Sequence, residues 1–316
     1  MPLDAQTEAY LAQAAANPQA DPTEEGIEAY REAAHSLAEL GPEPAALAGV
    51  RDIEAPGAGG GIPLRVYTPH GEGPFGILVY LHGGGFVRGD LKTHDRLCRA
   101  LATGAGCVVV AVHYRRPPEA LFPAALEDSD AATSWVSEHA AELGGDAARL
   151  AVAGDSAGGA LATVVARRAR ERGGPAIVHQ GLFYPALDAT HSSPSIDDFA
   201  EGYLLTRASL EWSFDQYVPG DVDRTQPELS PLFAENLSGL PLALVITAEF
   251  DPVRDEGEAY AERMRAAGVE VQSTRYDGTI HNFMLLAGVI DQGGAAIDQA
   301  TEALRRAFAR VGGNVR

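Results

Sequence analysis

The chain has 316 residues and a formal net charge of −20, and its length suits one large domain with an appended segment. The acidic charge argues against a nucleic-acid partner and an anionic membrane surface, because both attract Lys and Arg. Two cysteines, Cys98 and Cys107, form neither a disulfide framework nor a zinc-finger spacing, and we expect both to be core residues.

The first element in chain order is a helical segment over residues 1–45, rich in Ala, Glu, Leu and Tyr, which Gly41-Pro42 ends. It contains no strand pattern, so we expect it to pack over another part of the molecule. Its first residues lack a basic region followed by an apolar run, and no stretch approaches about 18 uninterrupted apolar residues. We therefore expect no signal peptide, no membrane span and a cytoplasmic location.

Short β-branched runs then alternate with helix-length segments. The runs are nearly continuous in apolar character, which is typical of strands buried on both faces of a parallel sheet. They are Phe75 to Leu81, Cys107 to Val112, Leu150 to Ala153, Ile177 to Phe183 and Leu242 to Thr247. The helical patterns are roughly Leu91 to Thr103, Ala124 to Leu143, Gly158 to Glu171, Asp255 to Ala267 and Ala295 to Val311. This alternation predicts an α/β fold with a mostly parallel sheet flanked by helices, which binds ligands at the carboxyl ends of its strands.

One segment breaks the alternation. Residues from about 188 to 223 form a long insertion that carries no clear strand and is rich in aromatic side chains. Because the insertion directly follows a predicted strand, we expect it to cover the site at that end of the sheet.

The motif Gly154-Asp155-Ser156-Ala157-Gly158 follows the predicted strand at 150–153 and opens a predicted helix. This is G-x-S-x-G in a strand–turn–helix context, where the serine sits on a sharp turn with its hydroxyl exposed. The glycines leave room for the neighbouring strand and helix, and the helix N-terminus supplies partial positive charge. The motif predicts Ser156 as a nucleophile, and the alternative is a glycine-rich turn with a capping serine.

A glycine-rich run, HGGGF at residues 82–86, directly follows the predicted strand at 75–81. Its backbone N–H groups have no side-chain cover and can stabilise a developing oxyanion, each by about 3–4 kcal/mol when buried. We assign Gly83 and Gly84 as donors, with the Ala157 N–H as the third, and expect His82 to orient the loop. A phosphate cradle is the alternative, but the chain has no G-x-x-x-x-G-K-[ST] motif and this run has no lysine.

A serine hydroxyl needs a base that titrates near neutral pH, and histidine is that base. Three histidines follow Ser156 in the chain: His179, His191 and His281. His179 lies within a predicted strand and His191 in the insertion, whereas His281 follows the strand-like run at 271–276 and a glycine turn. His281 is therefore the predicted base.

The base needs a carboxylate that fixes its tautomer, and with this type of serine turn the acid lies between the serine and the histidine in the chain. Asp251 directly follows the apolar run at 242–247 and is the predicted acid. Asp255 is the rival, which we expect instead to cap the helix that starts near Glu256.

Four motifs together resemble the bacterial hormone-sensitive-lipase family of esterases: HGGGFVRGD at 82–90, GDSAGG at 154–159, EFDPVRDEG at 249–257 and HNF at 281–283. The resemblance covers most of the chain from about residue 45 onward. It implies an α/β-hydrolase fold in which residues 46–316 form the catalytic domain. Residues 1–45, joined by the insertion at about 188–223, would form a small helical cap.

The resemblance also implies a carboxylesterase that hydrolyses short- to medium-chain acyl esters, its small-molecule substrates, through an acyl-enzyme. It implies Ser156, Asp251 and His281 as the triad, Gly83, Gly84 and Ala157 as the oxyanion hole, and neither metal nor organic cofactor. Members of the family are often homodimers through the last sheet edge, so we expect a homodimer here. The alternatives on the same residues are an amide or lactone hydrolase and a non-catalytic small-molecule receptor.

The chain departs from the family pattern at a few positions. His113 stands where aspartate is common, Arg116-Pro117 where leucine-alanine is usual, and Asn282 where the family commonly has glycine. None of these changes touches a triad atom, so we expect activity to be retained.

Substrate selection is expected from an apolar pocket near the cap. For each of its members the alternative is ordinary core packing. The predicted lining residues are Phe86, Tyr203, Leu204, Trp212, Phe214 and Phe283.

Overall fold

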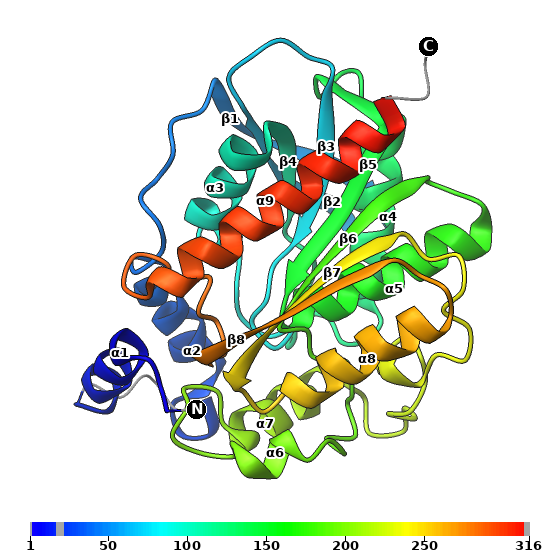
Figure 1. The fold of residues 1–316 in the computed structure, drawn as a ribbon. Coiled ribbons are helices and arrows are strands. Elements are labelled where there is room, and N and C mark those ends of the chain that lie inside the picture. The colour runs from blue at the N-terminus through cyan, green and yellow to red at the C-terminus, as the bar shows by residue number, and fades with distance from the viewer. Residues whose placement is uncertain (1, 17–21, 313–316) are drawn as a thin grey trace.

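The computed structural model describes residues 2–16 and 22–312, and its centre is a twisted eight-stranded sheet (Figure 1). The strand order is β1-β2-β4-β3-β5-β6-β7-β8, with β1, β2 and β4 paired antiparallel and all later neighbours parallel. The strands are β1 (Gly49–Gly57), β2 (Gly60–Thr68), β3 (Phe75–Leu81), β4 (Cys107–Val112), β5 (Gly145–Asp155), β6 (Ile177–Phe183), β7 (Leu242–Phe250) and β8 (Val271–Ile280). The predicted α/β fold with a mostly parallel sheet is confirmed.

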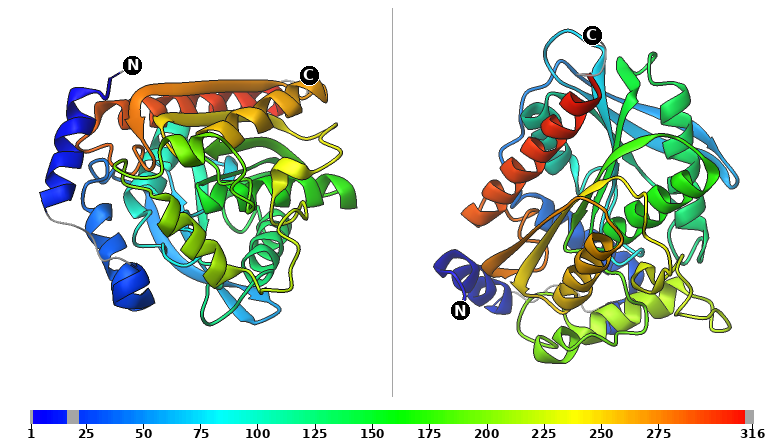
Figure 2. Two further views of the ribbon diagram at one scale, coloured as in Figure 1. Left: turned by 90° about the horizontal axis from the view of Figure 1, so that it is seen from below. Right: turned by 45° about the vertical axis from the view of Figure 1, so that its right-hand side comes forward.

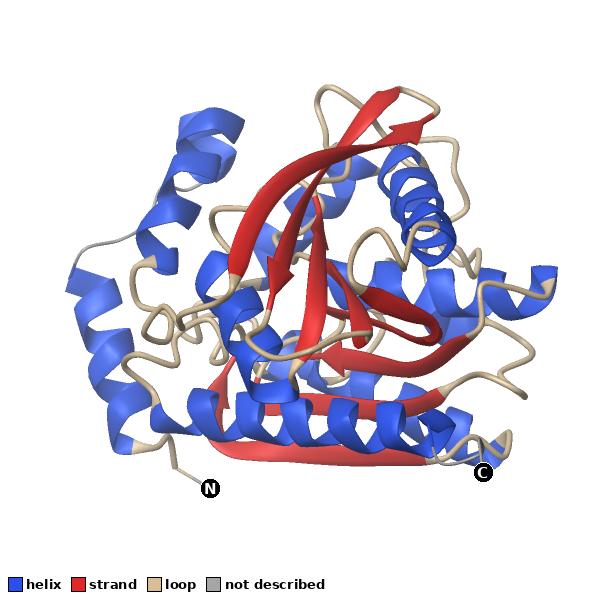
Figure 3. Ribbon diagram, turned by 90° about the horizontal axis from the view of Figure 1, so that it is seen from above, coloured by secondary structure: helices blue, strands red, loops and turns tan. Residues whose placement is uncertain are grey.

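Helices cover both faces of this sheet (Figure 3). Helices α3 and α9 lie on one face, and α4, α5 and α8 lie on the other. The helices of the described residues are α1 (Ala5–Ala16), α2 (Pro22–Ala38), α3 (Asp95–Ala105), α4 (Ala124–Glu138), α5 (Ala157–Arg172), α6 (Ser195–Asp198), α7 (Arg207–Tyr217), α8 (Arg254–Ala266) and α9 (Asp291–Gly312), with a short 3₁₀ turn η1 (Pro231–Phe233). Among them, none is long and apolar enough to cross a lipid bilayer.

The core is split by the sheet into two apolar clusters. Alternate residues of β3 enter each cluster, with Ile77 and Val79 facing α4 and α5, and Leu78 and Tyr80 facing α3 and α9. Every strand residue from Gly76 to Leu81 is buried, as the continuous apolar run predicts. Cys98 and Cys107 are both free and buried, which confirms the prediction that they are core residues.

The two predicted parts of the cap meet near the carboxyl ends of the strands (Figure 2). The Tyr30 ring of α2 packs edge-on against the Trp212 ring of α7, with the centroids 5.6 Å apart. Helix α1 lies elsewhere, because the Asp4 N–H just before it donates to the carbonyl of Gly278 in β8. Residue 1 and residues 17–21 of the predicted cap lie outside the described residues, and the division into cap and catalytic domain stays a prediction.

Candidate active site

Ser156 occupies a sharp turn between the end of β5 and the start of α5. Its backbone has φ 52° and ψ −121°, a conformation that costs an L-residue free energy and is typical of functional turns. A Cβ on Gly158 would lie 1.9 Å from the carbonyl oxygen of Leu81, and one on Gly154 would lie 2.3 Å from the carbonyl oxygen of Gly158. Only glycine fits these two positions, so the motif glycines are required by close packing around the turn.

Three polar side chains from different strand ends form a hydrogen-bonded chain at this turn. The Nε2 atom of His281 lies 3.0 Å from Ser156 Oγ, and its Nδ1 atom lies 2.7 Å from Asp251 Oδ2. The other carboxylate oxygen of Asp251 accepts a 3.0 Å hydrogen bond from the Val253 N–H. Asp251 is fully buried, and His281 and Ser156 are only 2% and 7% exposed. The arrangement allows the serine proton to move to His281 while Asp251 fixes the imidazole.

The alternative candidates for base and acid, His179, His191 and Asp255, lie outside the hydrogen-bonded series of Ser156, His281 and Asp251. His179 is buried within β6, and the His191 ring packs edge-on against Phe214 with the centroids 5.1 Å apart. Asp255 pairs with Arg254 and accepts a 3.0 Å hydrogen bond from the Ser195 N–H. The expectation that Asp255 caps a helix is wrong, because the N-cap of α8 is Val253 and makes no side-chain cap bond.

The glycine loop after β3 differs from its prediction at one residue. The Gly83 N–H donates a 2.9 Å hydrogen bond to Oδ1 of the buried Asp155 carboxylate. An N–H that is held in this way has no further proton to offer a substrate oxygen, so the prediction of Gly83 as an oxyanion donor is corrected. The close fit also restricts the position, since a Cβ on Gly83 would lie 2.2 Å from Asp155 Oδ2.

The two N–H groups that directly follow Gly83 in the loop, unlike that of Gly83, have no hydrogen-bond acceptor among the described residues. Among the described residues, no acceptor binds the backbone N–H of Gly84, Gly85 or Ala157. Gly84 and Gly85 have φ values of 119° and 61°, which favour glycine and turn the chain sharply. Three unpaired donors therefore lie on the loop and on the first residue of α5, next to Ser156.

His82 lies behind the loop, as expected of a residue that orients it. The His82 ring stacks on Tyr114 with the centroids 4.2 Å apart, and its Nδ1 atom lies 3.0 Å from the Gly83 carbonyl. Burial, followed by the nearby His94 and His113, holds the pKa of His82 well below its usual value. His82 is therefore neutral at physiological pH.

The departures from the family pattern surround the same loop. Burial lowers the pKa of His113, whose ring centroid is 6.0 Å from that of His82. The Arg116 guanidinium donates to the carbonyl of Gly89, and the carbonyl of Pro117 accepts a 2.7 Å bond from Arg31. These residues support the far end of the loop and do not enter the Ser156–His281–Asp251 chain.

The structure places the members of the predicted apolar pocket in different surroundings. Phe283 and Phe214 are 0% and 1% exposed and pack within the two core clusters. Phe86 is also buried and stacks on Tyr217 at 4.1 Å.

Of the three remaining members of the predicted pocket, Tyr203 and Leu204 are consecutive in the chain and Trp212 lies on α7. Tyr203 stacks on Phe250 with the centroids 5.1 Å apart, and Leu204 is partly buried with a φ of 72°. Trp212 packs against Tyr30, so it links the two parts of the cap. Their contact with a substrate stays a prediction.

Two functional candidates were missed by the sequence interpretation. Asp155 is a charged residue between a buried strand and the nucleophile candidate, and this position alone is a signal that its charge is used. Arg31 of α2 donates from Nε to the Val87 carbonyl at 3.0 Å and pairs with Glu119 at 2.8 Å. It ties the cap helix to the glycine loop, and its place on a helix rich in charged residues gives no signal in the sequence.

No group of three or more His, Cys, Asp or Glu side chains within residues 2–16 and 22–312 is arranged to hold a metal ion. At this site the described residues provide the hydrogen-bonded series of Ser156, His281 and Asp251 and the nearby unpaired backbone N–H groups.

Comparison with known proteins gives consistent matches. A model described as the α/β-hydrolase fold matches residues 78–285. Carboxylic ester hydrolase LipN of Mycobacterium tuberculosis is 44% identical over 91% of this chain and 78% of its own length. Ethyl acetate hydrolase of Pseudomonas putida is 41% identical over 78% of each chain. The structure of ester-hydrolase EH1AB1 from the Lake Arreo metagenome superimposes with a TM-score of 0.93 at 40% identity, covering 97% of this chain and 99% of the other.

Proposed function

The chain belongs to the α/β-hydrolase fold family, in its hormone-sensitive-lipase-like branch, and we propose that Ser156, His281 and Asp251 perform its carboxylic ester hydrolysis. The observation that carries the assignment is the buried chain of contacts from Ser156 Oγ to His281 Nε2 at 3.0 Å and from His281 Nδ1 to Asp251 at 2.7 Å. Carboxylic ester hydrolysis is the activity for which its relatives are named.

In the first half of the reaction, Ser156 Oγ attacks the ester carbonyl carbon while its proton passes to His281 Nε2. The tetrahedral intermediate collapses, and the leaving alkoxide takes the proton from His281 to depart as the alcohol. Asp251 stays ionised and stabilises the imidazolium through the Nδ1–H bond. The product of this half is an acyl ester on Ser156.

In the second half, His281 takes a proton from water, and the resulting hydroxide adds to the acyl carbon. Collapse releases the carboxylic acid and returns the proton to Ser156. Ordinary hydroxyl and imidazole chemistry suffices for every step, and the carbon oxidation state does not change.

The oxyanion in both intermediates is assigned to the N–H groups of Gly84, Gly85 and Ala157. The support for this assignment is that these donors have no acceptor among the described residues, whereas Gly83 is held by Asp155. The N-terminus of α5 adds a partial positive charge beside the same oxygen. Donors that are fixed before the reaction need no reorganisation when charge develops.

Short- to medium-chain acyl esters are the proposed substrates. The support is the small cap, in which α2 and α7 meet through Tyr30 and Trp212 across the strand ends. The test is a series of p-nitrophenyl esters from acetate to palmitate, for which kcat/KM is expected to peak among the short chains. A peak at palmitate would contradict this substrate range.

Amide or lactone hydrolysis is the second candidate, since the same triad serves any acyl transfer. Matched p-nitroanilides and lactones, assayed beside the ester series, separate these activities from esterase activity.

Two further features are proposals. A homodimer through β8 is favoured by the place of β8 at one edge of the sheet, and sedimentation equilibrium tests it. A cytoplasmic location is favoured by the two free buried cysteines, and cell fractionation tests it.

A further inference from the structure

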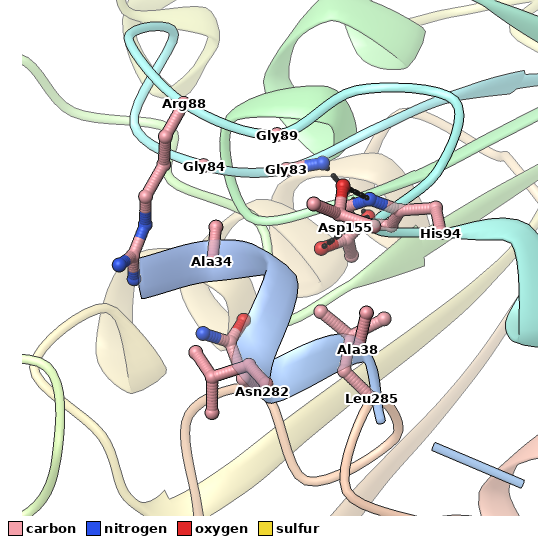
Figure 4. A pocket seen from close by; sticks show the side chains of 12 residues that line it. Ala34, Ala38, Gly83, Gly84, Arg88, Gly89, His94, Asp155, Asn282 and Leu285 are labelled. Atoms are coloured by element: carbon pink, nitrogen blue, oxygen red, sulfur yellow. Dashed lines mark hydrogen bonds and ion pairs between the residues drawn. The ribbon is translucent and has the colours of Figure 1, made fainter. Parts of the chain in front are cut away.

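A small cavity lies between helix α2 and the glycine loop (Figure 4). The loop contributes Gly83, Gly84 and Arg88 to its walls, α2 contributes Ala34 and Ala38, and Asn282 closes another side. Gly84 is a proposed oxyanion donor, and Asn282 directly follows His281. The cavity therefore borders the proposed reaction centre.

The size of the cavity favours a small group. Its volume is about 30 Å³, and a 1.4 Å probe needs roughly 10–15 Å³ for one water molecule. A carboxylate or an amide group fits such a space, whereas a long acyl chain does not. The small side chains of Ala34 and Ala38, together with the loop glycines, keep the space open.

Arg88 lines this cavity, and its guanidinium has no acidic partner among the described residues. Its guanidinium lies 4.1 Å from the centroid of the Tyr30 ring, and its side chain makes no hydrogen bond and no ion pair with any described residue. This is unusual in a chain with 44 acidic and 24 basic residues, where Arg31 of the adjoining helix α2 binds Glu119. The contact with Tyr30 holds the guanidinium in place and leaves its N–H donors free.

Asn282 adds a second unpaired polar group. Its backbone has a φ of 67°, which glycine adopts without strain and which asparagine tolerates better than most residues. Its carboxamide makes no hydrogen bond with the described residues, and Figure 4 shows Arg88 running from the glycine loop to one end of α2 and Asn282 lying on the other side of this helix from the loop. A side chain in place of glycine here supplies a donor and an acceptor beside the reaction centre.

Asp155 also borders the cavity, and its charge would repel an anion if it were exposed. Its Oδ1 atom accepts hydrogen bonds from the Tyr80 hydroxyl at 2.7 Å and the Gly83 N–H at 2.9 Å, and its Oδ2 atom lies 3.3 Å from His94 Nε2. Asp155 is fully buried, so these donors satisfy its charge within the fold.

We propose that this cavity is a subsite for a carboxylate carried by the ester substrate, with Arg88 as the counter-charge and the Asn282 carboxamide as a hydrogen-bond donor. The proposal rests on the proposed esterase function and narrows its substrates to esters that bear a carboxylate on the acyl or the alcohol part. A guanidinium binds a carboxylate through paired N–H donors, and the partly enclosed cavity strengthens that attraction relative to water.

The test uses two pairs of esters that differ only in charge. On the alcohol side, 4-acetoxybenzoate is compared with 4-acetoxybenzamide, and on the acyl side, the mono-p-nitrophenyl ester of adipic acid is compared with that of its monoamide. The expected result is that kcat/KM for the carboxylate member of at least one pair exceeds that of the amide by about tenfold or more. Added salt should reduce this ratio.

Three variants locate the effect. Arg88→Gln is expected to bring the carboxylate-to-amide ratio close to one, Arg88→Lys to keep part of it, and Asn282→Gly to lower it by a smaller factor. Arg310→Gln is the matched control, because Arg310 pairs with Glu270 on the surface of α9 and should leave the ratio unchanged. Circular dichroism of each variant checks that it is folded. The carboxylate-to-amide ratio of the wild type tests the subsite by itself, even if a variant fails to fold.

The outcomes separate the two proposals. Hydrolysis of the amide members without preference for the carboxylate overturns the subsite and leaves the esterase function standing. A preference that persists in folded Arg88→Gln overturns the role of Arg88. A third outcome is that free benzoate or adipate inhibits the enzyme, that Arg88→Gln relieves this inhibition, and that the charged esters are not preferred. This outcome assigns the cavity to free carboxylate ions and overturns the substrate subsite. Failure to cleave any of the four esters overturns the proposed function itself.

Discussion

The backbone N–H of Gly83 donates a hydrogen bond of 2.9 Å to the carboxylate of Asp155, the residue directly before Ser156. Gly83 opens the glycine loop and Asp155 ends β5, so this bond joins the loop that carries the proposed oxyanion donors to the turn that carries Ser156. The Tyr80 hydroxyl binds the same carboxylate oxygen at 2.7 Å and fixes it against the sheet. Two motifs that are 72 residues apart are thereby held in one geometry.

Asp155→Ala should loosen this connection. With the Gly83 N–H released, the donors at Gly84 and Gly85 lose their fixed position, and kcat should fall roughly 10- to 100-fold with a smaller change in KM. Asp155→Asn keeps an acceptor oxygen and should lose less. Steady-state kinetics on a p-nitrophenyl ester measures both, with Asp146→Asn as the control, because Asp146 is half-buried at the opposite end of β5 from Ser156. A folded Asp155→Ala protein with wild-type kcat would show that the bond does not position the loop.

Gly158→Ala should be strongly destabilising. The new Cβ would lie 1.9 Å from the Leu81 carbonyl, which cannot move without displacing the end of β3, so we expect a loss of roughly 3 kcal/mol or more, or failure to fold. Gly294→Ala in α9 is the matched control, since nothing lies within 4 Å of its Cβ, and the change should stabilise the protein by up to about 1 kcal/mol. Urea unfolding followed by circular dichroism compares the two. Equal stability of both variants would contradict the packing account of the motif glycine.

The buried part of the sheet could be predicted from the sequence, and its edges could not. The strands β3, β4 and β6 begin and end where their apolar runs do, because both of their faces are covered. Strands β1 and β2 were not predicted, since β1 is largely exposed and neither has a continuous apolar run. Strand β5 extends past its predicted run at both ends, where Gly145, Asp146 and the motif residues interrupt the apolar pattern.

His179 should make the protein sensitive to acid. Burial within β6 lowers the pKa of His179 from 6.5 to about 4, so the folded state resists its protonation. A lowered histidine pKa means that the unfolded chain binds more protons between pH 6.5 and 4. The stabilisation is therefore complete above about pH 6.5 and is lost as the pH falls toward 4, by roughly 1–2 kcal/mol between pH 7 and 5.

The check is the free energy of unfolding in urea at pH 7 and pH 5. Between pH 7 and pH 5, the free energy of unfolding should fall more in the wild type than in His179→Gln, because glutamine at position 179 does not titrate. An equal loss in both proteins would assign the acid sensitivity to other groups.

The contacts among Ser156, His281 and Asp251 could be predicted from chain order and strand ends, because each residue follows an apolar run. The glycine whose N–H is already bonded within the fold could not be predicted. Which of three consecutive glycines faces the substrate depends on the rotation of the loop, and the contact between Gly83 and Asp155 that sets this rotation joins distant parts of the chain. The burial of Phe214 and Phe283 in the core clusters could not be predicted, because composition does not distinguish a pocket wall from a core.

Arg31→Gln should weaken the connection between the cap and the glycine loop. Arg31 bonds to the carbonyls of Val87 and Pro117 at 3.0 and 2.7 Å, and the exposed Glu119 supplies a weaker, screened partner. We expect kcat/KM for a neutral p-nitrophenyl ester to fall about 3- to 10-fold, mainly through KM, because α2 covers the site less firmly. Arg96→Gln, which frees Glu39 and Gly41 but no loop residue, is the control. Equal kinetics of the two variants would contradict the connection.

The role of Ser156 as the nucleophile is tested most directly by kcat/KM for p-nitrophenyl butyrate with purified wild type and Ser156→Ala side by side. The serine hydroxyl is the atom that forms the acyl-enzyme, and its removal leaves only the oxyanion donors and substrate binding. We predict that kcat/KM of the folded variant falls by about 10³-fold or more. A folded Ser156→Ala protein that retains more than about 1% of wild-type kcat/KM would contradict the account.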